Sequence, residues 1–348
     1  MEFTAWSDVR KRIKQKQYAL LDLRSEGEFA KGAIPHAKNF PLLNNDERAA
    51  VGTLYKKEGK GPATRMGLEL FADKAEQFLE SCTSYFNGFD RVVIYCWRGG
   101  MRSRLVGMWL EAAGIPVMIL EGGYKSFRTF VLHSLDELAQ REFIVLNGLT
   151  GSGKTQLIKD MIMEGNSAID FEGIANHRGS AFGGFAQAKP SPTQQGFENQ
   201  LADIYLDLKQ TNKILVELEN NIGPVCLSKA LRNALCASPM VYLDRDFDDR
   251  VIFLAQEYAE NWNETEEKKF LLQAEQVKRF LSAEDFNKIC ECIRQRNFKA
   301  VITILLKNRY DKAYGKSLKR HQKQMIARFN ISTDSASAKD YLRQYLAN

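Results

Sequence analysis

The sequence predicts an α/β protein with two parallel-sheet domains, and two segments carry this prediction. Residues 92–95 and 143–146 are short apolar runs, each followed by a glycine-containing loop and then by a helical pattern. Strand, loop and helix in this order are the repeating unit of a parallel sheet. A length of 348 residues suits two such domains, and an apolar content of 44% is sufficient for two cores. We expect domains over residues 1–138 and 139–250, followed by a helical, basic C-terminal region over 251–348 that packs on the second domain.

The first loop places a cysteine between its strand and its helix. Cys96 directly follows the apolar run, and Arg102 opens a helical pattern that stops at Gly114. The loop between them contains Trp97, Arg98, Gly99, Gly100 and Met101. Backbone N–H groups at a helix N-terminus bind anions and, with nearby positive charge, lower the pKa of a thiol. Cys96 is therefore the candidate nucleophile above an anion-binding loop, and a cysteine that only packs in the core is the alternative.

The second loop matches the P-loop pattern with no departure over residues 148–155. Its candidate phosphate-binding residues are Gly148, Gly151, Ser152, Gly153, Lys154 and Thr155. Glycines let backbone N–H groups surround phosphate oxygens, Lys154 supplies charge, and the Thr155 hydroxyl can hold a metal ion such as magnesium. We therefore expect a P-loop NTPase-like domain. The motif leaves open whether it holds a nucleotide, a small diphosphate or a phosphate group of a macromolecule.

Three carboxylates follow the P-loop as possible acids. Asp170 and Glu172 are predicted to stand at a strand end, and Glu217 ends the apolar run 214–216, where a Walker B element would place its acid. A glutamate in place of the usual aspartate weakens the inference of nucleotide hydrolysis. The long loop after residue 175 is predicted to close over a ligand, with His177, Arg178 and Ser180 as its polar contacts, and a plain surface loop is the alternative. Residues 42–68 are predicted to be an inserted, polar, glycine-rich loop that could touch substrate, and a plain surface loop is the alternative.

Composition excludes several classes of protein. The sequence contains no apolar run long enough to span a bilayer and no signal-peptide pattern at its N-terminus. Its six cysteines form no Cys-x-x-Cys pair and its four histidines are scattered, so we predict no zinc site and no disulfide framework. These features indicate a cytoplasmic protein.

Charge is concentrated at the C-terminal end. Residues 301–348 contain ten Lys or Arg and three Asp or Glu, a net charge of +7, whereas the rest of the chain sums to −1. A basic segment on a near-neutral body predicts a polyanionic partner, and a solvated helix face is the alternative. The candidate RNA-binding residues, which lie among or beside tyrosines, are Lys316, Lys319, Arg320 and Lys323.

The N-terminal part resembles a rhodanese domain. Residues 20–41 match its opening, residues 120–124 match its closing strand and turn, and with the cysteine loop the resemblance covers residues 1–135. It implies a rhodanese-like fold that carries sulfur or selenium on Cys96. Five residues separate Cys96 from Arg102, one more than in ordinary rhodaneses. The loop is therefore closer in width to that of rhodanese-like phosphatases, and it argues against simple thiosulfate chemistry.

The chain as a whole resembles bacterial tRNA 2-selenouridine synthases. The matching segments are residues 96–103, 148–155 and 176–180. The resemblance implies that the substrates are the tRNAs for lysine, glutamate and glutamine with a 2-thiouridine at the wobble position. It also implies two steps: geranyl diphosphate alkylates the sulfur, and selenium from selenophosphate then displaces a geranylthiol by way of a selenylated Cys96. No tightly bound cofactor and no membrane are implied, and we expect a monomer.

Our hypothesis assigns one step to each domain. The P-loop would bind the diphosphate of geranyl diphosphate, with Lys154 and Arg178 stabilising the departing charge, and the cysteine loop with Arg102 would bind selenophosphate. An ATP-dependent tRNA sulfurtransferase, or kinase-like enzyme, is one alternative, and a non-catalytic rhodanese-type carrier of sulfur or selenium is the other. A phosphatase is disfavoured because Tyr95 stands where such enzymes usually have histidine.

Overall fold

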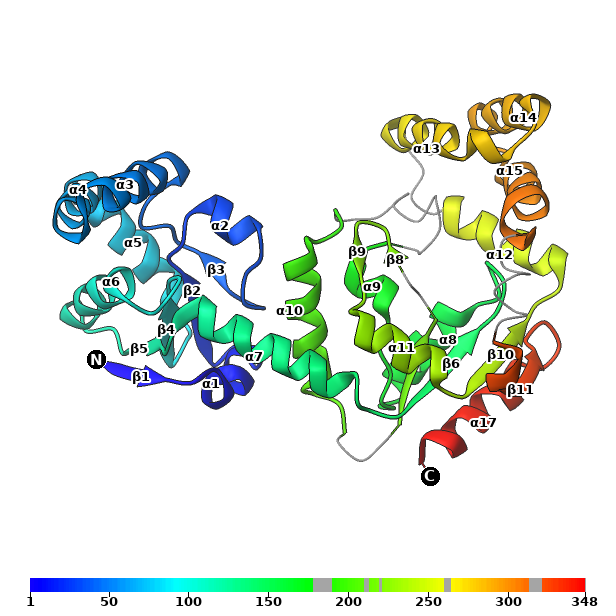
Figure 1. Cartoon of the computed structure of the whole chain (residues 1–348), viewed down its shortest axis with the longest axis horizontal. Helices are drawn as coiled ribbons and strands as arrows, with labels where there is room; N and C mark the ends of the chain where they lie inside the picture. Colours follow the sequence, from blue (N-terminus) through cyan, green and yellow to red (C-terminus); the bar gives the residue numbers. More distant parts are fainter. Residues whose placement is uncertain (178–189, 210–212, 219–220, 260–263, 313–320, 348) are drawn as a thin grey trace. The chain divides into compact units, whose positions relative to one another are not determined.

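The chain forms two compact units (Figure 1). The computed structural model describes residues 1–177, 190–209, 213–218, 221–259, 264–312 and 321–347. The first unit comprises Met1–His133 and Glu198–Ala202, and the second comprises Ser134–Phe197 and Asp203–Asn348. Helices α7 (Gly123–Leu138) and α10 (Gln194–Tyr205) contribute residues to both units. Residue 138, where we predicted the first domain to end, is the last residue of α7.

The first unit is built on a five-stranded parallel sheet with the order β1-β5-β4-β2-β3. Its strands are β1 (Glu2–Thr4), β2 (Tyr18–Asp22), β3 (Lys38–Asn39), β4 (Arg91–Tyr95) and β5 (Val117–Leu120). Its helices before α7 are α1 (Trp6–Lys14), α2 (Glu26–Ala30), α3 (Asn45–Glu58), α4 (Lys60–Ala72), α5 (Ala75–Phe86) and α6 (Met101–Ala112). Because β4 is central and parallel to its neighbours, the residue that follows it emerges at the carboxyl edge of the sheet, where ligands bind in such folds.

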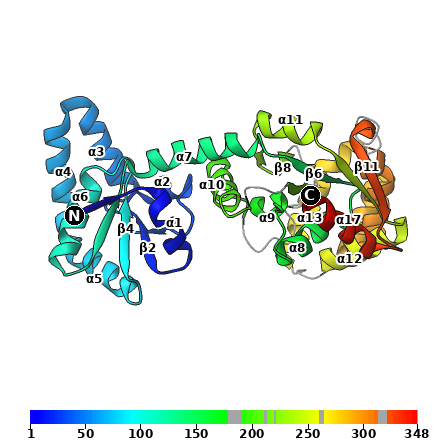
Figure 2. The same cartoon turned by 90° about the horizontal axis from the view of Figure 1, so that it is seen from below.

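Helices cover both faces of this sheet (Figure 2). Ile94 and Ile119 pack with Val106 of α6 and Phe86 of α5 in one buried cluster. Side chains alternate between the faces of a strand, so Val93 points to the opposite face. Helices α1 and α7 lie there, where the rings of Trp6 and Phe127 meet edge to face at 5.2 Å.

Residues 42–68, predicted as an inserted loop, instead form most of a helical hairpin of α3 and α4. Helix α3 begins with a capping box, in which the Asn44 side chain accepts from the Glu47 N–H and the Glu47 carboxylate accepts from the Asn44 N–H, each at 2.9 Å. Gly59, at φ +89°, lets the chain turn between the two helices. The prediction was wrong because the two helices are polar and glycine-containing, although the capping box was visible in the sequence.

The second unit is built on a four-stranded parallel sheet with the order β11-β10-β6-β7, beside an antiparallel pair of β8 and β9. Its strands are β6 (Phe143–Asn147), β7 (Ile214–Glu217), β8 (Asn221–Ile222), β9 (Val225–Cys226), β10 (Met240–Asp244) and β11 (Met325–Asn330). Its further helices are α8 (Lys154–Met163), α9 (Phe171–Ala175), α11 (Lys229–Ala237), α12 (Phe247–Ala259), α13 (Glu264–Val277), α14 (Ala283–Arg294), α15 (Phe298–Leu305) and α17 (Ser335–Ala347). Short 3-10 or π segments span Lys278–Phe280, Leu306–Tyr310 and Gln322–Gln324.

The C-terminal region is only partly helical, which corrects our prediction for residues 251–348. Helices α12 to α15 do share a core that includes Phe270, Ile289 and Val301. The segment Met325–Asn330, however, forms the edge strand β11 and pairs in parallel with β10. Its side chains alternate between half-buried and exposed, which is the pattern of a strand covered on one face. Of the helices in the described ranges, none has both the length and the apolar character needed to cross a membrane.

Candidate functional site

The cysteine loop joins β4 to α6 and presents its amide side to the thiol. The carbonyl oxygens of Cys96 and Trp97 accept from the N–H groups of Tyr124 and Lys125, both at 2.9 Å. These bonds turn the carbonyl side of the loop toward the start of α7. The N–H groups of Arg98 and Ser103 donate to the Cys96 sulfur from the other side.

Gly123 is required for the close approach between α7 and the cysteine loop. Its φ is +59°, and a Cβ atom placed on it would lie 2.3 Å from the Cys96 carbonyl oxygen and 2.5 Å from the Gly99 nitrogen. Both of these atoms are backbone, so the loop would have to move to accommodate a side chain. Gly114, after α6, has a similar φ of +78° but is surrounded by open space.

This pair of glycines gives a matched test of the loop. Gly123→Ala should lower the free energy of unfolding by about 3 kcal/mol or more, because a left-handed alanine is strained and its Cβ also collides with backbone. Gly114→Ala should cost about 1–2 kcal/mol, because only the strain applies. Urea denaturation measures both values, and equal losses would show that the contact at Gly123 is unimportant.

The environment of Cys96 favours its ionised form. The residue is 4% exposed, and burial by itself raises the pKa of its thiol. The net pKa is nevertheless below its ordinary value, because the thiolate is stabilised by the Ser103 hydroxyl, the Arg102 charge and the backbone N–H groups of Arg98 and Ser103. Cys82 shows the contrast, because burial raises the pKa of its thiol to about 12. Of these two buried thiols, Cys96 is the one suited to act as a nucleophile.

Glu28 holds the arginine of the cysteine loop in place. Its Oε2 atom accepts from Arg102 Nη1 at 3.2 Å and from the Ser25 N–H at 3.1 Å, and its Oε1 atom lies 3.7 Å from Arg48 Nη2. Burial raises the pKa of the Glu28 carboxyl, but Arg102 and the Ser25 N–H outweigh that effect and lower it. We did not predict a role for Glu28 from the sequence, although Ser25 and Glu28 have the spacing of a capping box.

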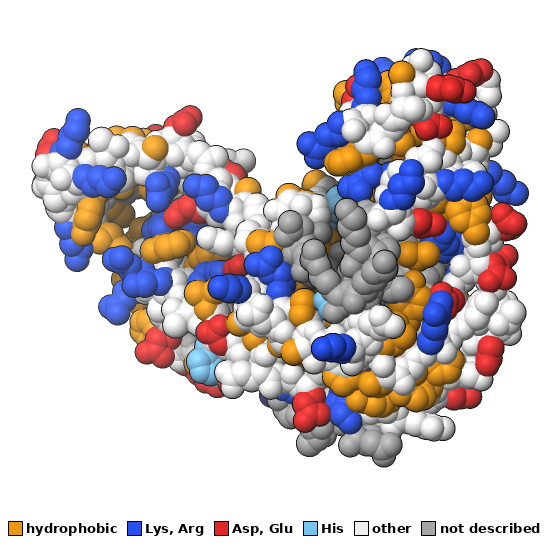
Figure 3. All heavy atoms as spheres, turned by 45° about the vertical axis from the view of Figure 1, so that its right-hand side comes forward, with side chains coloured by type: hydrophobic (Ala, Val, Ile, Leu, Met, Phe, Trp, Pro, Cys, Tyr) orange, Lys and Arg blue, Asp and Glu red, His pale blue; other side chains and the backbone are white. Residues whose placement is uncertain are grey.

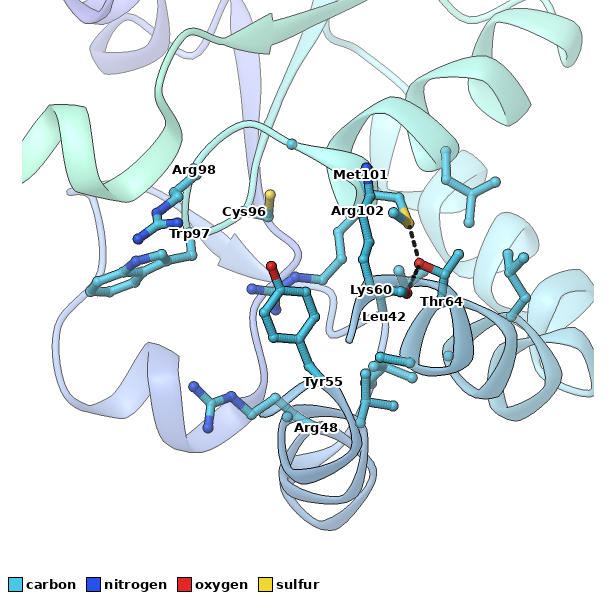
Figure 4. A pocket seen from close by; sticks show the side chains of 18 of the residues that line it. Leu42, Arg48, Tyr55, Lys60, Thr64, Cys96, Trp97, Arg98, Met101 and Arg102 are labelled. Carbon is cyan, nitrogen blue, oxygen red and sulfur yellow. Dashed lines mark hydrogen bonds between the residues drawn. The ribbon is translucent and has the colours of Figure 1, made fainter. Parts of the chain in front are cut away.

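A cavity of about 810 Å³ opens beside Cys96, between the cysteine loop and the α3–α4 hairpin. Figure 4 shows Tyr55 projecting from α3 toward the loop that carries Cys96. In Figure 3, a hollow with hydrophobic walls and Lys and Arg side chains around it is visible on this unit. The apolar part of the lining includes Leu42, Val51, Ala63, Leu68 and Leu105. The basic part comprises Arg48, Lys56, Lys60, Arg98 and Arg102. The cavity therefore combines an apolar wall, cationic groups and an activated thiol.

The P-loop joins β6 to α8 in the second unit. Three of its glycines have positive φ, and a Cβ atom on Gly148 would lie 2.5 Å from the Leu243 carbonyl oxygen. Lys154 lies across its own loop, where its Nζ atom donates to the carbonyl oxygens of Gly148 at 3.0 Å and Leu149 at 3.4 Å. Ser152 is fully buried, and its hydroxyl has no partner among the residues that the structure describes. A phosphate oxygen in the loop would provide acceptors for such groups.

Two carboxylates meet the hydroxyl of Thr155. The Oγ1 atom lies 3.0 Å from Glu172 Oε2 and 3.2 Å from Glu217 Oε2. The pKa of Glu172 is raised to about 7. Burial is the largest cause, the charges of Asp170 and Glu257 also raise the pKa, and Lys154 and Thr155 partly oppose the increase. Glu172 therefore changes its protonation near neutral pH, at the end of the P-loop where a metal ion would bind.

Two arginines that the sequence analysis did not assign to the site support the P-loop. Arg245, directly after β10, donates to the Gly151 carbonyl oxygen at 3.3 Å. Arg250 of α12 donates to the Thr150 carbonyl oxygen at 3.2 Å and pairs with Asp311 at 2.6 Å. Burial lowers the pKa of Arg245. The sequence signal for Arg245 was a basic residue directly after the apolar strand Met240–Asp244. That signal did not reveal its role, because the P-loop carbonyl group that it contacts lies about a hundred residues earlier in the chain.

Comparisons with known proteins identify the family. A family model described as the tRNA 2-selenouridine synthase AAA domain matches residues 141–348, which is more than half of the chain. The chain belongs to the tRNA 2-selenouridine synthase family. A model of the rhodanese-like domain matches residues 5–129. The predicted fold class is confirmed by these matches and by the two parallel sheets.

Two curated tRNA 2-selenouridine synthases match nearly the whole chain. The protein from Sulfurovum sp. (strain NBC37-1) is 33% identical over 92% of this chain and 94% of its own length. The one from Hydrogenovibrio crunogenus is 33% identical over 97% of this chain and 98% of its own length. Among solved structures, a rhodanese-related protein from Thermoplasma volcanium is 17% identical, with a TM-score of 0.23, and covers 36% of this chain and 89% of its own.

In this member of the synthase family, the predicted site residues fall into two groups, one in each unit. The first group is Cys96, Trp97, Arg98, Gly99, Gly100 and Arg102. The second is Gly148, Gly151, Ser152, Gly153, Lys154, Thr155, Glu172 and Glu217. Trp97 is partly exposed beside Tyr124, at a ring distance of 5.7 Å. Within the described ranges, no group of three His, Cys, Asp or Glu side chains is placed to hold a metal ion.

The other predicted site residues of this synthase-family chain belong to neither group or occupy different structural positions from those expected. Asp170 does not end a strand: its side chain caps α9 by accepting from the Gly173 N–H at 2.7 Å, and Glu172 lies within that helix. The half-buried His177 ring lies against Gly223, its pKa is lowered by burial, and its Nδ1 atom has no partner in the described part of the chain. Lys323 is exposed in the turn Gln322–Gln324. The remaining candidates, which lie outside the described residues, are Arg178, Ser180, Lys316, Lys319 and Arg320.

Proposed function

We propose that this chain converts 2-thiouridine to 2-selenouridine in the tRNAs for lysine, glutamate and glutamine by two successive substitutions. The sulfur first attacks geranyl diphosphate, so that a carbon–sulfur bond forms and diphosphate leaves. Selenium from selenophosphate then attacks C2 of the base, and geranylthiolate leaves. The observation that carries this proposal is the cavity beside Cys96, which offers an activated thiol, basic side chains and an apolar wall in one place.

We assign the alkylation step to the P-loop. Its amides, Lys154 and the buried Ser152 hydroxyl suit a diphosphate, whose charge increases as it departs. Thr155, backed by Glu172 and Glu217, has the chemistry to hold a hydrated magnesium ion, which would neutralise part of that charge. Arg178, which lies outside the described residues, remains our candidate for a further cation at this step.

We assign the selenium step to the cavity of the first unit. Arg98 and Arg102 suit the anionic selenophosphate, and the aliphatic wall suits the geranyl chain of the alkylated uridine. Water is excluded along such a wall, so the long tail would hold the modified base against the cysteine loop. Binding energy from a non-reacting part of a substrate is a recognised way to position its reacting atom.

A charge placed on the apolar wall tests whether the geranyl chain lies against that wall. Leu68 lines the cavity and is 45% exposed, whereas Met108 is 59% exposed on α6 and does not line it. Leu68→Glu should reduce conversion of an S-geranyl anticodon stem-loop by at least about tenfold, because burying the chain against a carboxylate is unfavourable. Conversion of an S-methyl stem-loop should hardly change, and Met108→Glu should affect neither substrate. Equal losses with both substrates would place the geranyl chain elsewhere.

The function as a whole is tested by nucleoside mass spectrometry. The purified chain is incubated with 2-thiouridine tRNA, geranyl diphosphate and selenophosphate, and each small molecule is omitted in turn. We expect S-geranyl-2-thiouridine when selenophosphate is absent, 2-selenouridine when all are present, and no selenouridine when geranyl diphosphate is absent. Selenouridine formed without geranyl diphosphate would refute the two-step reaction, and no product from the complete mixture would favour a non-catalytic carrier.

Nucleotide hydrolysis is the second candidate for the P-loop. Two carboxylates beside Thr155 could orient a metal ion and a water molecule, as in nucleotide-hydrolysing P-loop proteins. ATP and GTP turnover, measured with and without tRNA, separates the two candidates. Turnover that depends on tRNA and is required for product would favour the nucleotide.

A further inference from the structure

Electron balance restricts what Cys96 can accept from selenophosphate, and this argument rests on the function proposed above. Selenium in selenophosphate is already at the oxidation level of selenide. A bond between that selenium and a cysteine sulfur is more oxidised, so a selenylated Cys96 would need an external oxidant or would leave phosphorus in a reduced state. The proposed reaction supplies no oxidant, although the resemblance implied a selenylated cysteine.

We propose that Cys96 accepts the phosphoryl group of the donor and that selenium never bonds to the protein. Donor selenium first attacks C2 of the geranylated base: a carbon–selenium bond forms, the carbon–sulfur bond breaks, and geranylthiolate takes a proton from water. The Cys96 thiolate next attacks phosphorus: a sulfur–phosphorus bond forms, and the phosphorus–selenium bond breaks with its electron pair left on the selenouridine. Water then attacks the phosphocysteine, so that inorganic phosphate and the thiolate are released and a proton passes to solvent. Each step replaces one group on carbon or on phosphorus by another, so no atom changes its oxidation level.

The dimensions of the loop match a phosphoryl group. The backbone N–H groups of Arg98 and Ser103 point at the Cys96 sulfur, and the first N–H groups of α6 have no acceptor within the helix. A phosphoryl group in transfer presents three oxygens to such donors, whereas a single selenium atom presents none. Arg102, held by Glu28 at 3.2 Å, adds a fixed positive charge where the phosphoryl oxygens would lie. The loop is therefore an oxyanion cradle with the nucleophile at its base.

Ser103 has a place in the second half of this reaction. Its side chain is fully buried, and apart from the Cys96 thiol its hydroxyl has no partner among the described residues. A hydroxyl that donates to the sulfur stabilises the thiolate when it departs from phosphorus. Losing a hydrogen bond to a charged group changes a rate by about tenfold or more. Ser103 is thus a positioning residue whose removal should trap the phosphocysteine.

A phosphoryl group on Cys96 and a selenium atom on Cys96 add almost the same mass, so isotope labels are needed to distinguish the two adducts. The full chain is incubated with an S-geranyl-2-thiouridine stem-loop and selenophosphate that carries radioactive phosphorus or, in a parallel sample, radioactive selenium. The reactions are quenched rapidly, the protein is separated, and the labelled peptide is identified. The variants are Cys96→Ser, Ser103→Ala and, as a control that removes an exposed cysteine far from this loop in sequence, Cys226→Ser.

We expect phosphorus on the peptide that contains Cys96, about tenfold more of it in Ser103→Ala, none in Cys96→Ser, and an unchanged amount in Cys226→Ser. In Cys96→Ser, oligonucleotide mass spectrometry without phosphatase treatment should reveal a selenophosphorylated stem-loop. Selenium on the Cys96 peptide, or full turnover with neither label on the wild-type protein, would overturn the inference. Failure of the wild-type chain to form any selenouridine would instead refute the proposed function, so the two failures are distinguishable.

Discussion

Cys96→Ser is expected to abolish 2-selenouridine formation and to leave geranylation of the tRNA intact. The loop lowers the pKa of the Cys96 thiol through Ser103, Arg102 and two backbone N–H groups, and a serine hydroxyl in the same place remains protonated. The loss should be at least about a thousandfold, as expected when a nucleophile is removed. Thr155 and Lys154, to which we assign the first step, lie in the other unit.

The measurement compares two reactions of the same variant. Without selenophosphate, S-geranyl-2-thiouridine should form at the wild-type rate, and with selenophosphate no 2-selenouridine should appear. Cys226→Ser, which replaces an exposed cysteine of β9, should behave as wild type in both. If Cys96→Ser also failed to geranylate, the assignment of one step to each unit would be wrong.

Lys154→Ala is expected to lower the rate of geranylation by about a hundredfold to a thousandfold and to leave the rate of the selenium step unchanged. The lysine lies over the P-loop carbonyl oxygens at 3.0–3.4 Å, so it is positioned to move onto a diphosphate and stabilise its departing charge. When the substrate is a stem-loop that already carries S-geranyl-2-thiouridine, the variant should form 2-selenouridine at the wild-type rate. Lys299→Ala, on α15, provides a control for the loss of a lysine.

A mixing experiment sharpens this second prediction. Geranylated tRNA made by Cys96→Ser is a substrate for Lys154→Ala, so the two inactive variants together should restore 2-selenouridine. Recovery requires the intermediate to leave one molecule and bind another. A mixture that stays inactive, while each variant performs its own half-reaction, would show that the intermediate is not released.

Both candidate loops were predictable because each is encoded by consecutive residues. An apolar run before Cys96 and another before Gly148 become β4 and β6, and each loop then leads into a helix, as expected. Local patterns of this kind report on backbone conformation, since a strand end and a helix start impose it directly. The cradle geometry of the two loops could therefore be inferred without the fold.

The partners of these loops were not predictable, because they come from distant parts of the chain. Glu28 reaches Arg102 across 74 positions, and Arg245 reaches Gly151 across 94. The α3–α4 hairpin was mistaken for a loop, and with it the cavity beside Cys96 was missed. Strand β11 was also missed, because six alternating residues in a basic segment form a strand only when β10 is there to pair with them.

The sequence by itself determined where the two candidate loops lie: a thiol at a strand end before two arginines, and a P-loop that ends in a lysine and a threonine. These are properties of short segments, because backbone N–H groups and nearby charges act over a few ångströms. The tertiary structure decided what each loop can be used for. It placed a carboxylate behind Arg102 and an apolar wall beside the thiol. Both contacts depend on packing between segments that no local pattern brings together.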